Sequence, residues 1–155
     1  MRERKSEAPH DVDELRIGAL LRLSYEAAYG ELAARMRAHG FEPMRGTIAR
    51  PLETNPHGLR LTDLAEREGI TKQSMAEIVD GMERAGYVER APDPSDARAR
   101  LVRFTQKGRR ASKLASRLVR ELEAEWAKEL GARRFEDLKK TLRMVVAKRL
   151  PDVGR

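Results

Sequence analysis

Apolar side chains recur at helical spacing through most of the chain, and this pattern predicts long elements near both ends. Two neighbouring i, i+4 rows predict an amphipathic helix over residues 11–39. The same spacing predicts helices over residues 106–130 and 133–150, interrupted at Gly131. The two rows of the first helix are together wider than the stripe that one surface helix usually buries. Part of this apolar surface is therefore available to a partner.

A further helix is predicted to begin at Met44, where apolar residues again follow helical spacing. Pro51 has no backbone N–H and disfavours the α conformation in Arg50, the residue before it. We therefore predict that this helix kinks or ends near Arg50. Residues 55–58 are predicted to form a loop, and residues 59–61 a short strand.

Two shorter helices are predicted next, over residues 63–68 and 72–85, with a tight turn at Gly69 between them. Thr62 and Thr71 stand where N-cap residues are preferred, because a hydroxyl can accept a hydrogen bond from a free backbone N–H. The second of these helices has an apolar row that we expect to face the interior: Met75, Ile78, Val79 and Met82.

Alternation of apolar and polar residues then predicts two strands, over residues 87–90 and 101–105. The linker of residues 91–99 is rich in proline and aspartate, which favour turns. Thr105 is placed to cap the helix that follows. Helix, tight turn, helix and strand pair in this order are typical of a winged helix-turn-helix. The predicted fold class is therefore mainly α with a small β-wing.

Composition narrows the possible partners and chemistry. The 155 residues are consistent with one structural domain, and 32 Lys and Arg against 25 Asp and Glu give a net charge of +7. This balance favours a polyanion such as nucleic acid. The absence of cysteine excludes disulfides, thiolate zinc sites and thiol redox sensing. With no signal peptide and no apolar run of membrane-spanning length, we expect a cytoplasmic protein.

The start of the second short helix carries side chains suited to base edges. A helix-turn-helix presents the N-terminal residues of its second helix to the major groove. Glutamine can pair with adenine through two hydrogen bonds, lysine can reach guanine acceptors, and hydroxyls can serve phosphate or base. The predicted DNA-binding residues of this helix are Thr71, Lys72, Gln73, Ser74 and Glu77.

A run of basic residues follows the turn of the strand pair. It comprises Arg98, Arg100, Arg103, Lys107, Arg109 and Arg110. Arg98 and Arg100 lie nearest the turn, where an arginine can enter a narrow minor groove or neutralise a phosphate. We predict that both bind DNA, and that Asp96 structures the wing by holding Arg98 in an ion pair.

Residues 96–105 (DARARLVRFT), followed by Lys107 and Gly108, resemble the wing of the MarR family of bacterial transcription regulators. Residues 64–66 (LAE), 71–73 (TKQ) and 82–90 (MERAGYVER) match the same family. The resemblance implies an obligate homodimer with its recognition helices in successive major grooves and Arg98 in the minor groove. It also divides the chain into a flexible arm (residues 1–10), dimerisation helices (11–43 and 106–155) and a DNA-binding module (44–105).

The resemblance further implies a small effector, often aromatic and anionic, bound between the dimerisation helices and the DNA module. The side chains that could line such a pocket, or could instead be ordinary core residues, are Tyr25, Tyr29, Met44, Ile48 and Trp126. No cofactor is expected. The three histidines are isolated in sequence, and no phosphate-binding loop or nucleophile motif occurs, so we predict neither a metal site nor an enzyme.

Two hypotheses for the function remain open. In the first, the protein is a dimeric, sequence-specific transcription regulator, as a rule a repressor in this family, which binds a pseudo-palindromic operator and is released by an effector. In the second, it is a ligand-binding or protein-interaction dimer with only non-specific DNA affinity. Preference for a palindromic site over bulk DNA separates the two hypotheses.

Overall fold

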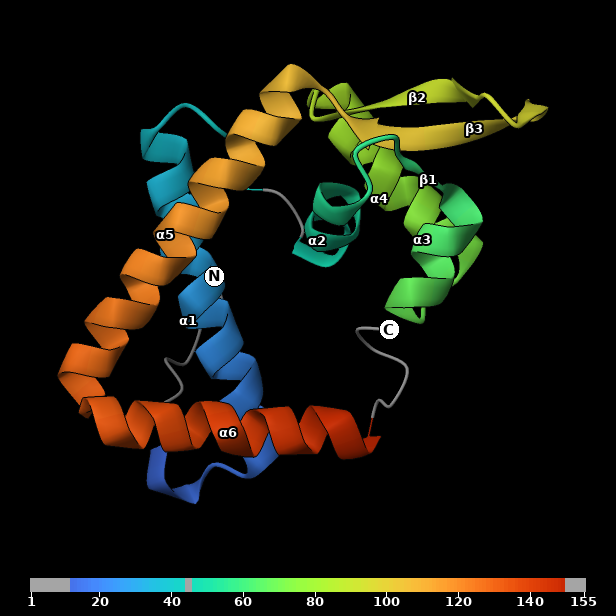
Figure 1. Cartoon of the computed structure of the whole chain (residues 1–155). Helices are drawn as coiled ribbons and strands as arrows, with labels where there is room; N and C mark the ends of the chain where they lie inside the picture. The colour runs from blue at the N-terminus through green and yellow to red at the C-terminus, as the bar shows by residue number, and fades with distance from the viewer. Residues whose placement is uncertain (1–11, 44–45, 150–155) are drawn as a thin grey trace, which may run out of the picture.

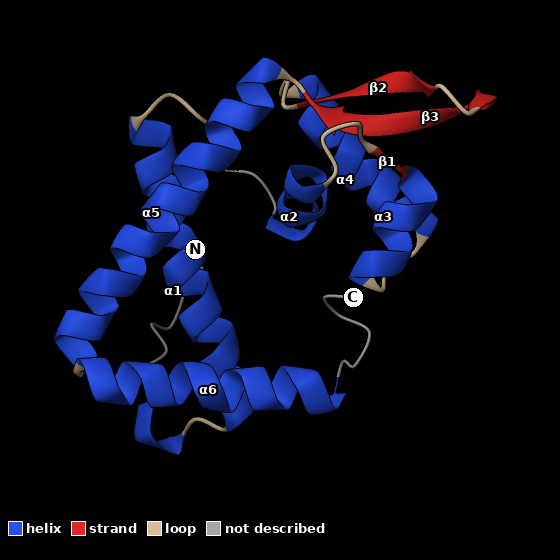
Figure 2. Cartoon of the chain, viewed as in Figure 1, coloured by secondary structure: helices blue, strands red, loops and turns tan. Residues whose placement is uncertain are grey.

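The computed structural model describes residues 12–43 and 46–149 (Figure 1). In chain order its elements are η1 Val12–Glu14, α1 Ile17–Ala38, α2 Gly46–Thr54, β1 Leu59–Arg60, α3 Leu61–Glu68, α4 Lys72–Arg84, β2 Val88–Asp93, β3 Asp96–Phe104, α5 Gln106–Leu130 and α6 Ala132–Arg149. The strands form one antiparallel sheet in the order β1-β3-β2 (Figure 2). The predicted fold class, mainly α with a small β-wing, is confirmed. The predicted arm of residues 1–10 lies outside the described residues.

Three long helices, α1, α5 and α6, form an open frame beside the smaller elements (Figure 1). Arg35 of α1 pairs with Glu125 of α5, and Lys139 of α6 pairs with Glu123 of α5 at 2.8 Å. Much of the apolar surface of the frame is not covered within the chain. The large side chains that remain exposed include Ile17, Leu20, Leu21, Leu23 and Tyr25 on α1. On α6 they are Leu138, Met144, Val145 and Val146.

The smaller elements enclose the main core. Its largest buried side chains come from α2, α3, α4, β2 and β3, together with Met36 of α1: Met36, Ile48, Leu64, Met75, Val79, Val88 and Val102. Of the row predicted to face inward on α4, Met75, Val79 and Met82 are buried, and Ile78 packs against the core while half-buried. This packing anchors α4 by one face and leaves its opposite face free.

Of the two outcomes predicted near Arg50, a kink or a helix end, the end is wrong: α2 continues past Pro51 to Thr54. Pro51 removes one backbone hydrogen bond from the helix. The helical conformation nevertheless buries Ile48 and Leu52 side by side in the core, at 0% and 2% exposure. Fully burying the two side chains contributes about 3–6 kcal/mol, which offsets the local penalty of about 3 kcal/mol for a helical proline.

The threonine caps are confirmed at two of three positions. Thr71 accepts a hydrogen bond from the N–H of Ser74, and Thr105 accepts one from the N–H of Gly108 at 3.0 Å. The prediction for Thr62 is wrong, because α3 begins at Leu61, two residues earlier than predicted. Pairing of β1 with β3 holds the chain extended up to Arg60, which takes the N-cap position without a side-chain cap. Gly69 ends α3 in the left-handed conformation, with φ 62°.

The strands of the ribbon, here called the wing (residues 88–104), are longer than predicted. Residues 91–93 and 96–99, predicted as linker, belong to the strands, and only residues 94 and 95 form the turn. Proline is tolerated at residue 92 because a register shift follows it in this outer strand. Arg98 therefore lies on β3 rather than in a loop, together with Arg100.

Candidate nucleic-acid interface

The N-cap and the first two turns of α4 present five exposed polar side chains. They are those predicted from the sequence to meet DNA: Thr71, Lys72, Gln73, Ser74 and Glu77. The Thr71 hydroxyl accepts the N–H of Ser74 at 3.1 Å, and the two hydroxyl oxygens lie 2.9 Å apart. The hydroxyls are thus partly engaged in the cap. Lys72 and Gln73 have no side-chain partner among the described residues, so their donors are free for a ligand.

The basic residues that follow the wing turn separate into two groups. Arg103 pairs with Glu89 at 2.8 Å, Lys107 donates to the Ala85 carbonyl at 2.7 Å, and Arg109 donates to the Phe104 carbonyl at 2.7 Å. Arg98, Arg100 and Arg110 are exposed and make no side-chain pair within the described part of the chain. The first group stabilises the protein, and the second group is available to a polyanion.

The base of the wing is tied to α4 by an arginine that sequence reasoning did not single out. Arg90 of β2 pairs with Asp80 at 2.5 Å and with Glu83, both on α4. Its backbone N–H also donates to Glu83. Because two carboxylates of the helix hold one residue of the strand, the ribbon and α4 are linked at this end. In Figure 1 the far end of the ribbon projects away from the frame.

The wing tip (residues 93–98) is organised by Arg60, which sequence reasoning also missed. Its guanidinium donates to Asp93 at 2.9 and 2.6 Å and lies 3.5 Å from Asp96. Asp93, one of the few buried polar residues at 8% exposure, accepts hydrogen bonds from the N–H and hydroxyl of Ser95. Two aspartates in a short turn indicate that a basic side chain lies nearby to offset their negative charge. Nothing local identifies it as an arginine 33 residues away.

Asp96 structures the wing tip, but not by the predicted ion pair with Arg98. One Asp96 oxygen accepts the backbone N–H of Arg98 at 3.0 Å, and the other faces Arg60 at 3.5 Å. The β3 conformation directs this carboxylate to the main chain instead of the Arg98 side chain. The Arg98 guanidinium is consequently not neutralised by Asp96.

Acid should weaken the wing tip only at low pH. Hydrogen bonds from Ser95 and from Arg60 lower the pKa of Asp93 to about 2. The folded-state pKa lies below the unfolded value of about 3.9, so the stabilisation by ionised Asp93 is complete above about pH 4. It is lost as the pH falls toward about 2. The unfolding temperature of the wild type should therefore exceed that of Asp93→Asn by a constant amount at neutral pH. This difference in unfolding temperature should shrink below about pH 4. A difference that persists unchanged at pH 2 would contradict this account.

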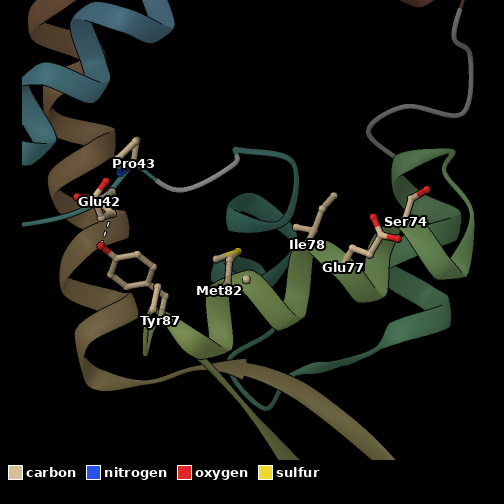
Figure 3. A pocket seen from close by; sticks show the side chains of 9 residues that line it. Glu42, Pro43, Ser74, Glu77, Ile78, Met82 and Tyr87 are labelled. Atoms are coloured by element: carbon tan, nitrogen blue, oxygen red, sulfur yellow. Dashed lines mark hydrogen bonds between the residues drawn. The ribbon is translucent and has the colours of Figure 1, made fainter.

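A cavity of about 590 Å³ lies against the side of α4 (Figure 3). Ser74, Glu77, Ile78 and Met82 of α4 line one wall, and Glu42 and Pro43 come from the segment after α1. Tyr87 closes one end, where its hydroxyl donates to the Glu42 carbonyl at 2.9 Å. Ser74 and Glu77 thus belong both to the cavity and to the exposed surface of α4.

The side chains predicted to line an effector pocket do not gather at this cavity. Tyr25 and Tyr29 stack on each other along α1, with ring centroids 6.0 Å apart, and Tyr25 is exposed. Ile48 is fully buried in the core, and Trp126 is half-buried on α5. Met44 lies outside the described residues.

Within residues 12–43 and 46–149, no group of three or more His, Asp or Glu side chains is arranged to hold a metal ion. No helix of that part of the chain combines the length and apolar character that crossing a membrane requires. The unpaired side chains of Lys72, Gln73 and Arg98 on this surface supply hydrogen-bond donors and positive charge.

The chain is similar to proteins of one family of regulators. The MarR family model matches residues 39–99. The HTH-type transcriptional repressor Rv2887 of Mycobacterium tuberculosis is 30% identical over 127 residues, which cover 82% of this chain and 86% of that protein. The transcriptional activatory protein BadR of Rhodopseudomonas palustris is 38% identical over 64 residues. That match spans 41% of this chain and only 35% of BadR.

Solved structures share the arrangement of elements. The transcriptional repressor CouR bound to a 23-mer DNA duplex matches with a TM-score of 0.71 at 24% identity, over 88% of this chain and 96% of that one. Rv2887 in complex with salicylic acid matches with a TM-score of 0.61 at 27% identity, over 86% and 98% of the two chains. The likeness thus extends beyond residues 39–99 to the long helices.

Proposed function

Because the chain belongs to the MarR family of transcription regulators, we propose that it is a dimeric repressor that binds a pseudo-palindromic operator and is released by a small molecule. It would act in the cytoplasm, on chromosomal DNA. The assignment as a repressor follows Rv2887, whose similarity extends over most of both chains, rather than the shorter match to the activator BadR.

One observation carries the DNA-binding part of this proposal. The free donors of Lys72 and Gln73 start an exposed helix, and the unpaired Arg98 and Arg100 occupy the ribbon of the same module. A helix with free polar groups at its N-terminal turn suits the major groove, and a free arginine on the ribbon suits phosphate or the minor groove. CouR, which has the same fold, is solved on a DNA duplex.

Dimerisation is proposed from the exposed apolar side chains of the frame. They concentrate on the first half of α1 and on α6, away from the wing (Figure 1). Contiguous apolar surface of this kind marks association sites. A two-fold dimer would place two α4 helices about one DNA turn, roughly 34 Å, apart, which is why the operator should be a pseudo-palindrome.

The effector is proposed to occupy the cavity beside α4. Ser74 and Glu77 line this cavity and also belong to the proposed DNA surface. A bound effector and DNA would therefore contact the same two side chains. Rv2887, a member of the same family, is solved with salicylic acid. A ligand that moves α4 would also change the spacing of the two half-sites, and the dimer could no longer engage both.

Competition binding at physiological salt tests the function directly. The operator is first selected from fragments of the source genome, and labelled operator is then displaced by unlabelled operator or bulk DNA. A sequence-specific regulator should prefer its operator by about 10³-fold or more. Equal competition by bulk DNA would favour the alternative, a ligand-binding or interaction dimer with only non-specific DNA affinity.

Gln73→Ala should change base preference at one position in each half-site. If Gln73 makes a two-hydrogen-bond contact with a base, its loss costs about 1–3 kcal/mol at that position. Binding to an operator library with single base changes measures this effect. Arg120→Ala, at an exposed position on α5, is the control that should leave base preference unchanged. A uniform loss of affinity for all sequences with Gln73→Ala would assign Gln73 to helix positioning instead.

A further inference from the structure

Arg60 connects two parts of the DNA-binding module, the helix-turn-helix and the wing tip, between which strand pairing provides few contacts. Its backbone ends β1 and begins α3, with φ −66° and ψ 151° at the N-cap position. Its side chain extends to the wing tip. One residue therefore belongs by its main chain to the helix-turn-helix and by its side chain to the ribbon.

The wing tip receives little other support. Strand β1 pairs with β3 only at Val102 and Leu101, so the ribbon beyond these residues has two strands. The register shifts after Pro92, and the last pair joins Asp93 to Asp96. A two-stranded ribbon that projects from a sheet is marginally ordered without further contacts.

Arg60 meets both carboxylates that shape this tip. Its Nε and Nη2 atoms donate to one oxygen of Asp93, and Nη2 lies 3.5 Å from Asp96. The other Asp93 oxygen accepts two hydrogen bonds from Ser95, and Asp96 accepts the backbone N–H of Arg98. The contacts run from Arg60 through one acidic residue to the main chain of Arg98.

We propose that Arg60 is a positioning residue for the wing, which sets the place of Arg98 relative to α4 so that both engage DNA as one unit. This inference rests on the proposed function, in which Arg98 contacts DNA. Arg60 itself has a geometric role: a planar guanidinium can hold two carboxylates in fixed directions, whereas a lysine ammonium acts as a point charge.

A double-variant cycle separates positioning from direct contact. Arg60→Ala, Arg98→Ala and the combined variant are titrated with operator DNA at several salt concentrations. Each single variant should lose about tenfold in affinity, and the combined variant should lose no more than Arg98→Ala alone. Each of the three should lower the salt slope by about one, because the same phosphate contact is lost.

Independent losses, with a slope lowered by about two in the combined variant, would show that Arg60 contacts DNA by itself and would overturn the inference. Wild-type affinity in either single variant would overturn it as well. Arg120→Ala removes an equal charge from an exposed position on α5 and is the matched control. Should Arg60→Ala fail to fold, Arg60→Met keeps the apolar stem and serves in the same cycle.

The two proposals fail in different ways. If the wild type shows no preference for operator over bulk DNA, the proposed function is wrong whatever Arg60 does. If the wild type is specific but the cycle is additive, only the role of Arg60 is wrong. Arg60→Lys adds a further readout: it keeps the charge but should still lose most of the affinity that Arg60→Ala loses.

Discussion

Val145→Glu combined with Val146→Glu should yield a monomer whose operator affinity is at least about 100-fold lower than that of the wild type. A dimer that engages two half-sites gains such a factor because the second contact becomes intramolecular. In the single chain these side chains are 48% and 43% exposed, so the glutamates should be tolerated by the fold. In an apolar interface the same charges would lose their hydration without gaining partners.

Sedimentation and operator titration of the same samples measure this prediction. Lys140→Glu is the matched control, since it adds negative charge to the same helix at a side chain that is 69% exposed. At 100° per residue, Lys140 lies about 140° around α6 from Val145 and about 120° from Val146, so it does not share their side of the helix. A Val145→Glu/Val146→Glu variant that remains a dimer with wild-type affinity would move the interface away from this part of α6.

Gly108→Ala should destabilise the protein by about 3 kcal/mol, the upper part of the usual range for overpacking. Gly108 lies in the first turn of α5, directly against the start of β2. An added Cβ would fall on the Tyr87 carbonyl oxygen and lie 2.8 Å from Cδ1 of Phe104. The Tyr87 carbonyl cannot simply move, because it accepts the N–H of Thr105 at 3.0 Å.

Urea unfolding of wild type and variant measures the difference in the free energy of unfolding. Gly30→Ala is the control, because Gly30 lies inside α1 with no atom within 4 Å of its added Cβ. There the exchange should stabilise the helix by about 1 kcal/mol. Equal stability of Gly108→Ala and wild type would mean that the contact between α5 and the wing base relaxes freely.

The pattern of apolar residues, caps and glycines predicted the element order, and the structure confirms it. The surface that meets DNA stays a prediction. Thr71, Thr105 and Gly69 were correctly interpreted because a cap or a left-handed glycine depends on residues within one helical turn. The predicted placement of Lys72 and Gln73 at an exposed helix start follows from the Thr71 cap.

The errors arose where distant contacts outweighed local preference. Pro51 predicted a helix kink or end near Arg50, yet α2 does not end there, because burial of Ile48 and Leu52 in the core extends the helix to Thr54. Thr62 is a good cap by residue type, but strand pairing at Arg60 starts the helix earlier. The turn-rich residues of the wing form strands because a neighbouring strand supplies the partners for their backbone groups.

By itself the sequence determined the fold class, the family resemblance and the capped, polar start of α4, because these depend on short-range periodicity and spacing. Only the tertiary structure decided which arginines remain free. Arg98 and Arg103 are alike in sequence, but Glu89 lies across the ribbon from Arg103, while Asp96 turns to the backbone and to Arg60. An ion pair depends on which side chains the fold brings within a few ångströms, and chain spacing does not encode that distance.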